Sequence, residues 1–172
     1  MGAMDKQQSL PEDDADLRQF LRGTSFFGGL EPKIAEQVLA MLKQRRVAAG
    51  ETLFSEGESG HSMYIVCEGA LMVSRHCPHG TEARLQMMRP GDFFGVTALI
   101  EMEARPFGCI AEKDSVVYEL TNADLYQLYK TDLKGYVLVL QNVARELCRR
   151  LRKAAVRIAS LEDTLHQKER ST

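Results

Sequence analysis

The sequence lacks a membrane-spanning run and an excess of charge of either sign. No apolar stretch approaches the roughly 20 residues that a transmembrane helix needs, and the N-terminus lacks the basic-then-apolar pattern of a signal peptide. The 22 Lys and Arg residues nearly balance the 24 Asp and Glu residues, so the formal net charge is only −2. Because the chain has no overall basic character, we expect a cytoplasmic protein that binds neither membranes nor, directly, nucleic acid.

The sequence also lacks residue patterns that carry catalysis or bind metals. Its four cysteines form no C-x-x-C pair, and Cys67 and Cys109 lie in apolar, strand-like runs, which is typical of reduced, buried thiols in the cytosol. The segment 76–80 reads His-Cys-Pro-His-Gly, but this is turn chemistry between two strand-like runs, so we expect no metal site. No nucleophile–base pair or carboxylate dyad is evident, and we expect no enzymatic activity.

What is present is a succession of short helices and short strands. Residues 17–21 and 32–42 read as helices, and the second places its apolar residues on one helical face. From Val47 onward the hydrophobic period changes to two, and glycines separate the runs. The strand-like runs are 52–54, 62–66, 70–75, 83–87, 109–111 and 115–120. Strands this short, with frequent turns, favour an antiparallel sandwich or barrel with flanking helices.

The C-terminal part follows a heptad pattern. Thr121 is the predicted N-cap of a short helix that precedes the heptad segment. After Gly135 the sequence contains neither proline nor glycine. At about 1.5 Å per residue, a helix over 132–166 would be a rod of roughly 50 Å, too long to bury its apolar stripe on its own domain. We therefore predict a homodimer through a parallel coiled coil; the alternative is a stripe packed wholly on its own domain. The predicted dimer seam is Val137, Leu140, Ala144, Leu147, Leu151, Ala154, Ile158, Leu161 and Leu165.

These patterns divide the chain into three parts. Residues 1–15 read as a cloning tag and a loose, acidic lead-in, residues 16–131 as a mainly β domain with flanking helices, and residues 132–168 as a coiled-coil helix. Within the β domain, the segment 90–107 carries the strongest functional signal. It reads as a strand end, a glycine turn, one turn of helix and an arginine, and a backbone turn at a helix start together with an arginine can bind a phosphate.

Together with 49–57 and 63–69, this segment resembles the cyclic-nucleotide-binding domain family. That family includes the bacterial catabolite activator and the regulatory subunits of protein kinase A, and the resemblance covers Phe20 to about Arg152. It implies an antiparallel β-roll of jelly-roll topology that is flanked by helices and ends in a long C-terminal dimerisation helix. A cyclic nucleotide or another phosphate-bearing ligand is the implied partner.

The resemblance also implies site residues, and three of them depart from the family pattern. Backbone N–H groups of Gly95, Thr97 and Ala98 would meet the cyclic phosphate, and the guanidinium of Arg105 would pair with it. The family's glutamate for the ribose 2′-hydroxyl is replaced by Val96, which has no acceptor. After the arginine stand Pro106, which has no N–H, and Phe107, which is bulky where the family is small.

The departures predict weak or absent binding of ordinary cyclic AMP. Losing the ribose acceptor and one phosphate donor would remove about 3–6 kcal/mol, which is on the order of a hundredfold to ten-thousandfold in affinity. A ligand without a ribose 2′-hydroxyl, or one bound in another pose, would fit better. Arg105 also has a plainer interpretation, a surface ion pair with Glu101 or Glu103.

Three functions remain open on the sequence. The first is a dimeric sensor or regulatory module that relays its ligand state from the β-roll to the C-terminal helix. The second is a ligand-free scaffold whose pocket is closed by Phe107 and Val96. The third is the sensor fragment of a catabolite-activator-type transcription regulator without its DNA-binding domain.

Basic residues beside the seam bear on the choice of partner. Arg149, Lys153 and Arg157 recur every four residues on one strip of the predicted helix. Such a strip is usually a solvated face whose charges pair with acids such as Glu146. The sharper interpretation is a surface for an anionic partner, such as a dinucleotide, an acidic protein or nucleic acid.

Overall fold

The computed structural model describes residues 8–9 and 14–170. Most of the predicted tag and lead-in, residues 1–15, lies outside the described residues. Within them, strands form two antiparallel sheets, with the orders β1-β2-β9-β4-β7 and β3-β8-β5-β6. The strands are β1 (Gln8–Ser9), β2 (Lys43–Val47), β3 (Thr52–Phe54), β4 (Ser62–Glu68), β5 (Leu71–His76), β6 (Glu82–Met88), β7 (Phe93–Phe94), β8 (Gly108–Ala111) and β9 (Ser115–Thr121). The predicted antiparallel β-roll is confirmed.

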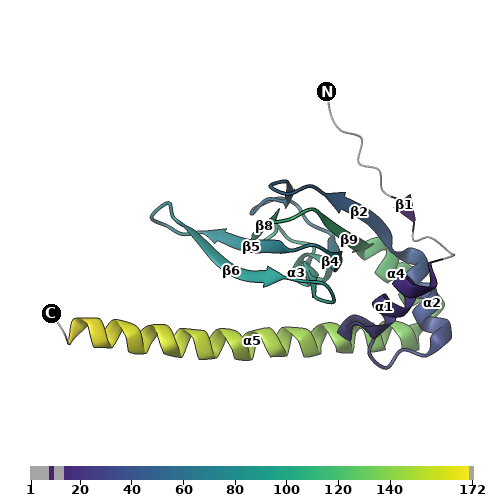
Figure 1. The fold of residues 1–172 in the computed structure, drawn as a ribbon. Coiled ribbons are helices and arrows are strands. Elements are labelled where there is room, and N and C mark those ends of the chain that lie inside the picture. Colours follow the sequence, from purple (N-terminus) through teal and green to yellow (C-terminus); the bar gives the residue numbers. More distant parts are fainter. Residues whose placement is uncertain (1–7, 10–13, 171–172) are drawn as a thin grey trace.

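The helices gather at one end of the roll and along one side of it (Figure 1). They are α1 (Ala15–Gly23), the 3₁₀ turn η1 (Ser25–Phe27), α2 (Pro32–Met41), α3 (Val96–Glu101), α4 (Asn122–Thr131) and α5 (Leu133–Glu169). Local chemistry fixes several ends. Pro32 occupies the first turn of α2. Thr121 and Asp124 form a reciprocal capping box at the start of α4, so the predicted N-cap is confirmed.

One strand that the hydrophobic pattern missed is β2. Its sequence is Lys-Gln-Arg-Arg-Val, and only Val47 is buried. A strand of this composition shows no apolar alternation, and its position is set instead by antiparallel pairing with β9, in which Arg45 lies opposite Val117. Tertiary pairing therefore decided its conformation, because the local residue pattern carries no strand signal.

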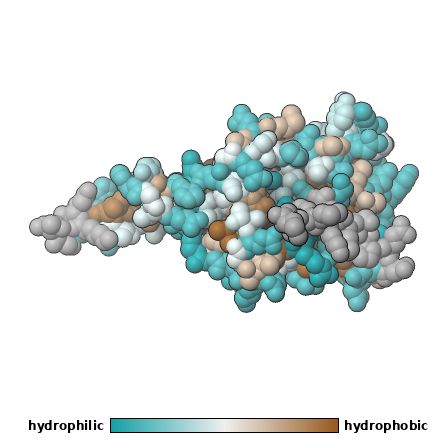
Figure 2. Space-filling view, turned by 90° about the horizontal axis from the view of Figure 1, so that it is seen from above, coloured by the Kyte–Doolittle hydropathy of each residue, from teal (hydrophilic) through white to brown (hydrophobic). Residues whose placement is uncertain are grey.

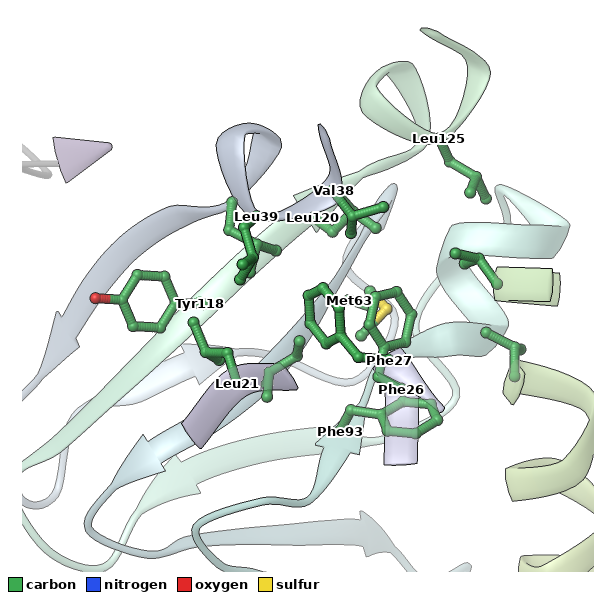
Figure 3. Close-up of a cluster of buried hydrophobic side chains, with 14 of the residues drawn as sticks. Leu21, Phe26, Phe27, Val38, Leu39, Met63, Phe93, Tyr118, Leu120 and Leu125 are labelled. Atoms are coloured by element: carbon green, nitrogen blue, oxygen red, sulfur yellow. The ribbon is translucent and has the colours of Figure 1, made fainter. Parts of the chain in front are cut away.

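Alternating side chains divide the core into two clusters. Phe93 points into a cluster between the first sheet and the helices, and the next residue, Phe94, points into a cluster between the two sheets. Ile65 and Tyr64 on β4 divide in the same way, as the period-two geometry of a strand requires. Figure 3 shows the first cluster, with Phe93 close to side chains from the helical end of the domain.

Helix α5 buries side chains against the domain only in its first half. Val139 and Val143 are buried, and the side-chain amide of Asn142 donates to the carbonyl oxygens of Phe26 and Gly28, each at 2.8 Å. Farther along, Leu151 is 72% exposed and Ile158 is 60% exposed. The predicted long C-terminal helix is confirmed, and the alternative of a stripe packed wholly on its own domain is wrong.

The rest of α5 passes beneath β6 and extends past the β5–β6 hairpin (Figure 1). Figure 2 shows apolar side chains on this projecting arm, where the domain does not cover them. Within residues 8–9 and 14–170, no helix is both long enough and apolar enough to cross a bilayer.

Candidate functional site

The predicted cassette forms the β7–α3 turn. Gly95 follows β7, caps the start of α3 and adopts φ +79°. Two constraints require glycine here. The left-handed backbone disfavours a side chain, and a Cβ would lie 3.1 Å from both Nη1 of Arg105 and the carbonyl oxygen of Ser62. The start of α3 therefore lies closely against the guanidinium of Arg105.

Arg105 is buried, with only 4% of its surface exposed. Its Nη1 donates to the carbonyl oxygen of Ser62 at 3.1 Å, and its Nη2 donates to Oγ of the same serine at 3.1 Å. Its Cζ lies 3.9 Å from the ring centroid of Phe54, a stacked cation–π contact. The alternative of a surface ion pair with Glu101 or Glu103 is wrong, because both acids are exposed while the guanidinium is buried among other groups.

The charge of Arg105 has no direct counter-charge within the described part of the chain. No carboxylate forms an ion pair with it, and its Nε is buried without a hydrogen-bond partner. Burying a cation without an ion-pair partner costs several kcal/mol, and neutral acceptors together with a ring face offset only part of that cost. The guanidinium therefore retains unused donor capacity for an anion.

A chain of hydroxyl groups leads inward from the arginine. Ser62 Oγ donates to the Tyr64 hydroxyl at 3.2 Å, and that hydroxyl donates to the Glu119 carboxylate at 3.3 Å. Burial, with a further contribution from the negative charge of Glu119, raises the pKa of Tyr64. The phenol therefore stays protonated and orients the serine that holds Arg105.

The structure separates the other predicted cassette residues. A Cβ at Gly60 would lie 2.8 Å from Ala98 Cβ and 2.8 Å from Arg105 Cγ, so these three residues meet. Val96 is instead buried in the core cluster between the sheet and the helices, and Phe107 packs against the cluster between the sheets.

The groups that enclose the guanidinium are thus different from the two predicted to close the pocket. They are Phe54, Gly60 and Ser62, with Gly95 from the cassette itself. The first three are not among the site residues predicted from the sequence. A signal was present only for Ser62, because strand alternation places it on the same face of β4 as the inward-facing Tyr64. Thr97 and Pro106 are half-buried beside the site.

Helix α5 contacts the same segment from the other side. The guanidinium of Arg150 donates to the carbonyl oxygen of Phe93, and its Nε donates to Glu146 at 2.8 Å. Arg149 also donates to Glu146, at 2.9 Å. Burial alone would raise the pKa of Glu146, but the hydrogen bonds from the two arginines outweigh it and hold that pKa below its ordinary value. On the basic strip, the expected pairing of Arg149 with an acid is therefore present.

The histidine and cysteine residues considered for metal binding or thiol reactivity make structural contacts instead. No cluster of three or more His, Cys, Asp or Glu residues within the described ranges could hold a metal ion. The ring of His76 instead lies 3.2 Å from the Glu56 carboxylate. Burial raises the pKa of the Cys67 and Cys109 thiols to about 12, so both stay protonated at neutral pH.

Comparisons with known proteins agree with this geometry. The model of a family described as the cyclic nucleotide-binding domain matches residues 44–132. The chain is 29% identical over 134 residues to the cyclic AMP receptor protein of Thermus thermophilus, covering 78% of this chain and 60% of that protein. It is 26% identical over 149 residues to the CRP-like cAMP-activated global transcriptional regulator of Mycobacterium tuberculosis, covering 84% of this chain and 63% of that regulator.

Solved structures show the same fold. The catabolite activator protein of Thermus thermophilus superposes with a TM-score of 0.72 at 28% identity, over 81% of this chain and 63% of that one. The N-terminal domain of a transcriptional regulator from Streptomyces coelicolor superposes with a TM-score of 0.69 at 27% identity, over 79% of this chain and 94% of that one. The chain thus spans 60–63% of the length of the two curated relatives described above.

Proposed function

Because this chain belongs to the cyclic nucleotide-binding domain family, we propose that it is a non-enzymatic, cytoplasmic sensor or regulatory module that works as a homodimer. In this proposal a phosphate-bearing ligand binds between Gly95 and Arg105, and α5 carries the resulting change to the second subunit. Two of the relatives are a cyclic AMP receptor protein and a cAMP-activated regulator, which supports a ligand-controlled role.

The observation that carries the proposal is the state of Arg105. A guanidinium that is 4% exposed, bonded only to neutral oxygens of Ser62 and left with a buried, unpartnered Nε is poised to bind an anion. A phosphate would supply the missing negative charge through charge-assisted hydrogen bonds. The same burial means that a ligand has to open the site, so part of its binding energy is spent on displacing the protein's own contacts.

The identity of the ligand is limited by what surrounds the cradle. Val96 has no acceptor for a ribose hydroxyl and is 2% exposed within the core. Pro106 offers no N–H to a phosphate. We therefore propose weak or absent binding of ordinary cyclic AMP, and a ligand that does not depend on a ribose 2′-hydroxyl.

The relay runs from β7 to α5. Arg105 touches the Gly95 end of the β7–α3 turn, and Arg150 donates to Phe93, two residues earlier. An anion that moves Gly95 would therefore also move an acceptor of α5. Such a link allows a ligand to bias a two-state arrangement through different contacts in each state.

The dimer is supported by the exposed half of the seam. Leu151, Ile158, Leu161 and Leu165 are each more than half exposed on the single subunit, at 72%, 60%, 56% and 57%. An exposed apolar stripe of this length marks an interaction surface, and its heptad spacing fits a second copy of the same helix.

Two alternatives each have one observation in their favour. A ligand-free scaffold is favoured by the near-complete enclosure of Arg105. The sensor part of a transcription regulator is favoured by the Thermus and Mycobacterium relatives, of whose length the chain spans 60% and 63%.

A ligand screen by thermal unfolding separates these functions. The protein is heated with cyclic AMP, cyclic GMP, cyclic dinucleotides or inorganic phosphate, and a ligand at a hundred times its dissociation constant adds about 2.7 kcal/mol. We expect a ligand other than cyclic AMP to stabilise the wild type and the exposed control Arg89→Ala, but not Arg105→Met. Micromolar binding of cyclic AMP would refute the predicted loss of affinity. No stabilisation by any ligand would favour the scaffold.

A further inference from the structure

We propose that Arg157 bridges two elements, the β6 strand of its own subunit and Glu162 of a second copy of this chain, and thereby links the β5–β6 hairpin to the dimer. This inference rests on the dimer proposed above. It adds the register of the two parallel helices and gives Arg157 of the basic strip a specific partner.

The heptad pattern assigns a position to each residue of α5. With the seam residues at a and d, the g positions are Tyr136, Val143, Arg150, Arg157 and Thr164. The middle three contact their own domain. Val143 is 2% exposed in the core, Arg150 donates to the Phe93 carbonyl of β7, and Arg157 Nη1 donates to the Leu85 carbonyl of β6 at 3.1 Å. The g column therefore lies on the side of α5 that faces its own β-roll.

In a coiled coil the g position borders the seam. Residues at e and g flank the a and d positions and form the ion pairs that set partner choice and orientation. A g residue of this chain thus lies where three elements would meet, namely its own helix, its own β-roll and the helix of a second copy. Arg157 uses only Nη1 for Leu85, which leaves the other guanidinium donors for a second acceptor.

The chain supplies one suitable acceptor. In a parallel coil, the g position of one heptad lies opposite the e position of the next heptad on the partner, which places Arg157 opposite Glu162. Among the e positions Gln141, Cys148, Ala155 and Glu162, only the last is acidic. Its side chain is 65% exposed and makes only a 4.0 Å contact with His166, so it is available to the second copy.

Charge also decides the orientation. An antiparallel coil would place g positions opposite g positions, and because no g position of α5 carries an acid, Arg157 would find no carboxylate there. The parallel coil instead pairs Arg157 with Glu162 twice, once on each side of the two-fold axis. Arg150 would lie opposite Ala155, which has no acceptor in its side chain, so Arg150 stays committed to Phe93. The two arginines thus have different roles: Arg150 contacts β7, and Arg157 joins β6 to the second subunit.

A charge-reversal cycle tests the bridge. The dimer dissociation constant is measured by sedimentation equilibrium for the wild type, Arg157→Glu, Glu162→Arg and the double variant. From the magnitudes of exposed helix ion pairs, we expect each single variant to weaken the dimer roughly tenfold. The double variant should return to within about threefold of the wild type, and the penalties should shrink in 1 M salt. The control Arg152→Glu reverses a charge at the b position and should leave the dimer unchanged.

Two further measurements distinguish a failure of the Arg157 bridge from a failure of the proposed dimer. Arg157→Glu should speed amide exchange in residues 82–88, because β6 is an edge strand that loses its contact with α5; exchange unchanged from the wild type would overturn the link to the hairpin. Leu151→Glu should abolish the dimer through the seam. If the wild type dimerises and Leu151→Glu disrupts it, but the double variant does not recover, the bridge is wrong while the proposed dimer stands. A wild type that stays monomeric at 100 μM would overturn both.

Discussion

The buried guanidinium of Arg105 contributes little net stability to the ligand-free protein, and the substitution Arg105→Met tests this. The change removes two hydrogen bonds to Ser62, worth about 1.5–3 kcal/mol each, and a desolvated cation–π contact with Phe54, worth about 2 kcal/mol. Against this loss stands the cost of burying an ion that is only 4% exposed, which is several kcal/mol. Methionine keeps most of the volume and a favourable sulfur–aromatic contact.

The two sides nearly cancel, so Arg105→Met should change the free energy of unfolding by no more than about 1 kcal/mol. The matched variant Arg105→Ala removes the same charge but leaves a cavity, and it should cost about 2–5 kcal/mol. Urea unfolding at one fixed protein concentration measures both, since the proposed dimerisation would make the midpoint depend on concentration.

One result would refute this reasoning. If Arg105→Met were as destabilising as Arg105→Ala, by more than about 3 kcal/mol, the bonds to Ser62 and the stack on Phe54 would outweigh the burial cost. Arg105 would then stabilise the fold through these contacts, and its burial would no longer favour the binding of an anion.

The remaining predictions concern the groups around this site. Gly60→Ala should cost about 1–3 kcal/mol in urea unfolding, because its Cβ would press on Ala98 and Arg105, whereas Gly23→Ala, with open space around it, should be neutral or slightly stabilising. Ser62→Ala should cost about 1–3 kcal/mol in the wild type but less in the Arg105→Met background, and equal costs would contradict their coupling. The folded-state pKa of Glu146 lies below its ordinary value of 4.5, so the stability it adds is present above that value and is lost as the pH falls through the folded pKa. The difference between wild type and Glu146→Gln in unfolding experiments should therefore be constant near pH 7 and shrink below about pH 4.5; a constant difference down to pH 3 would contradict it.

The fold could be predicted because its signals are local. The period-two runs, the glycine turns and the heptad spacing each depend on residues close together in the sequence, and the strands and α5 follow them. The strand β2 could not be found in this way, because its polar residues are held in place by β9, which lies far away in the chain.

The site could be predicted only in part for the same reason. The motif placed Gly95, Ala98 and Arg105 together, but the groups that enclose the arginine come from other segments. Phe54 and Gly60 lie before β4, far from Arg105 in the sequence, and no residue pattern predicted that they would contact its side chain. The burial of the guanidinium and its bonds to neutral oxygens depend on contacts between segments that are distant in the sequence.

The placement of α5 determines what kind of motion a ligand could transmit. Val143, Arg150 and Arg157 hold the helix to the core, to β7 and to β6 along one straight column. A shift of β7 would pull on the middle contact, and the exposed contact between Arg157 and Leu85 could yield with it. A long helix resists bending over two heptads, so the strain is relieved more easily by rotation about the helix axis, which changes the direction of the whole a and d stripe. Because g adjoins that stripe, even a small rotation would alter the seam presented to a second copy. If the proposed ligand acts through β7, the contacts of α5 therefore favour a change in helix pairing over a change in helix shape.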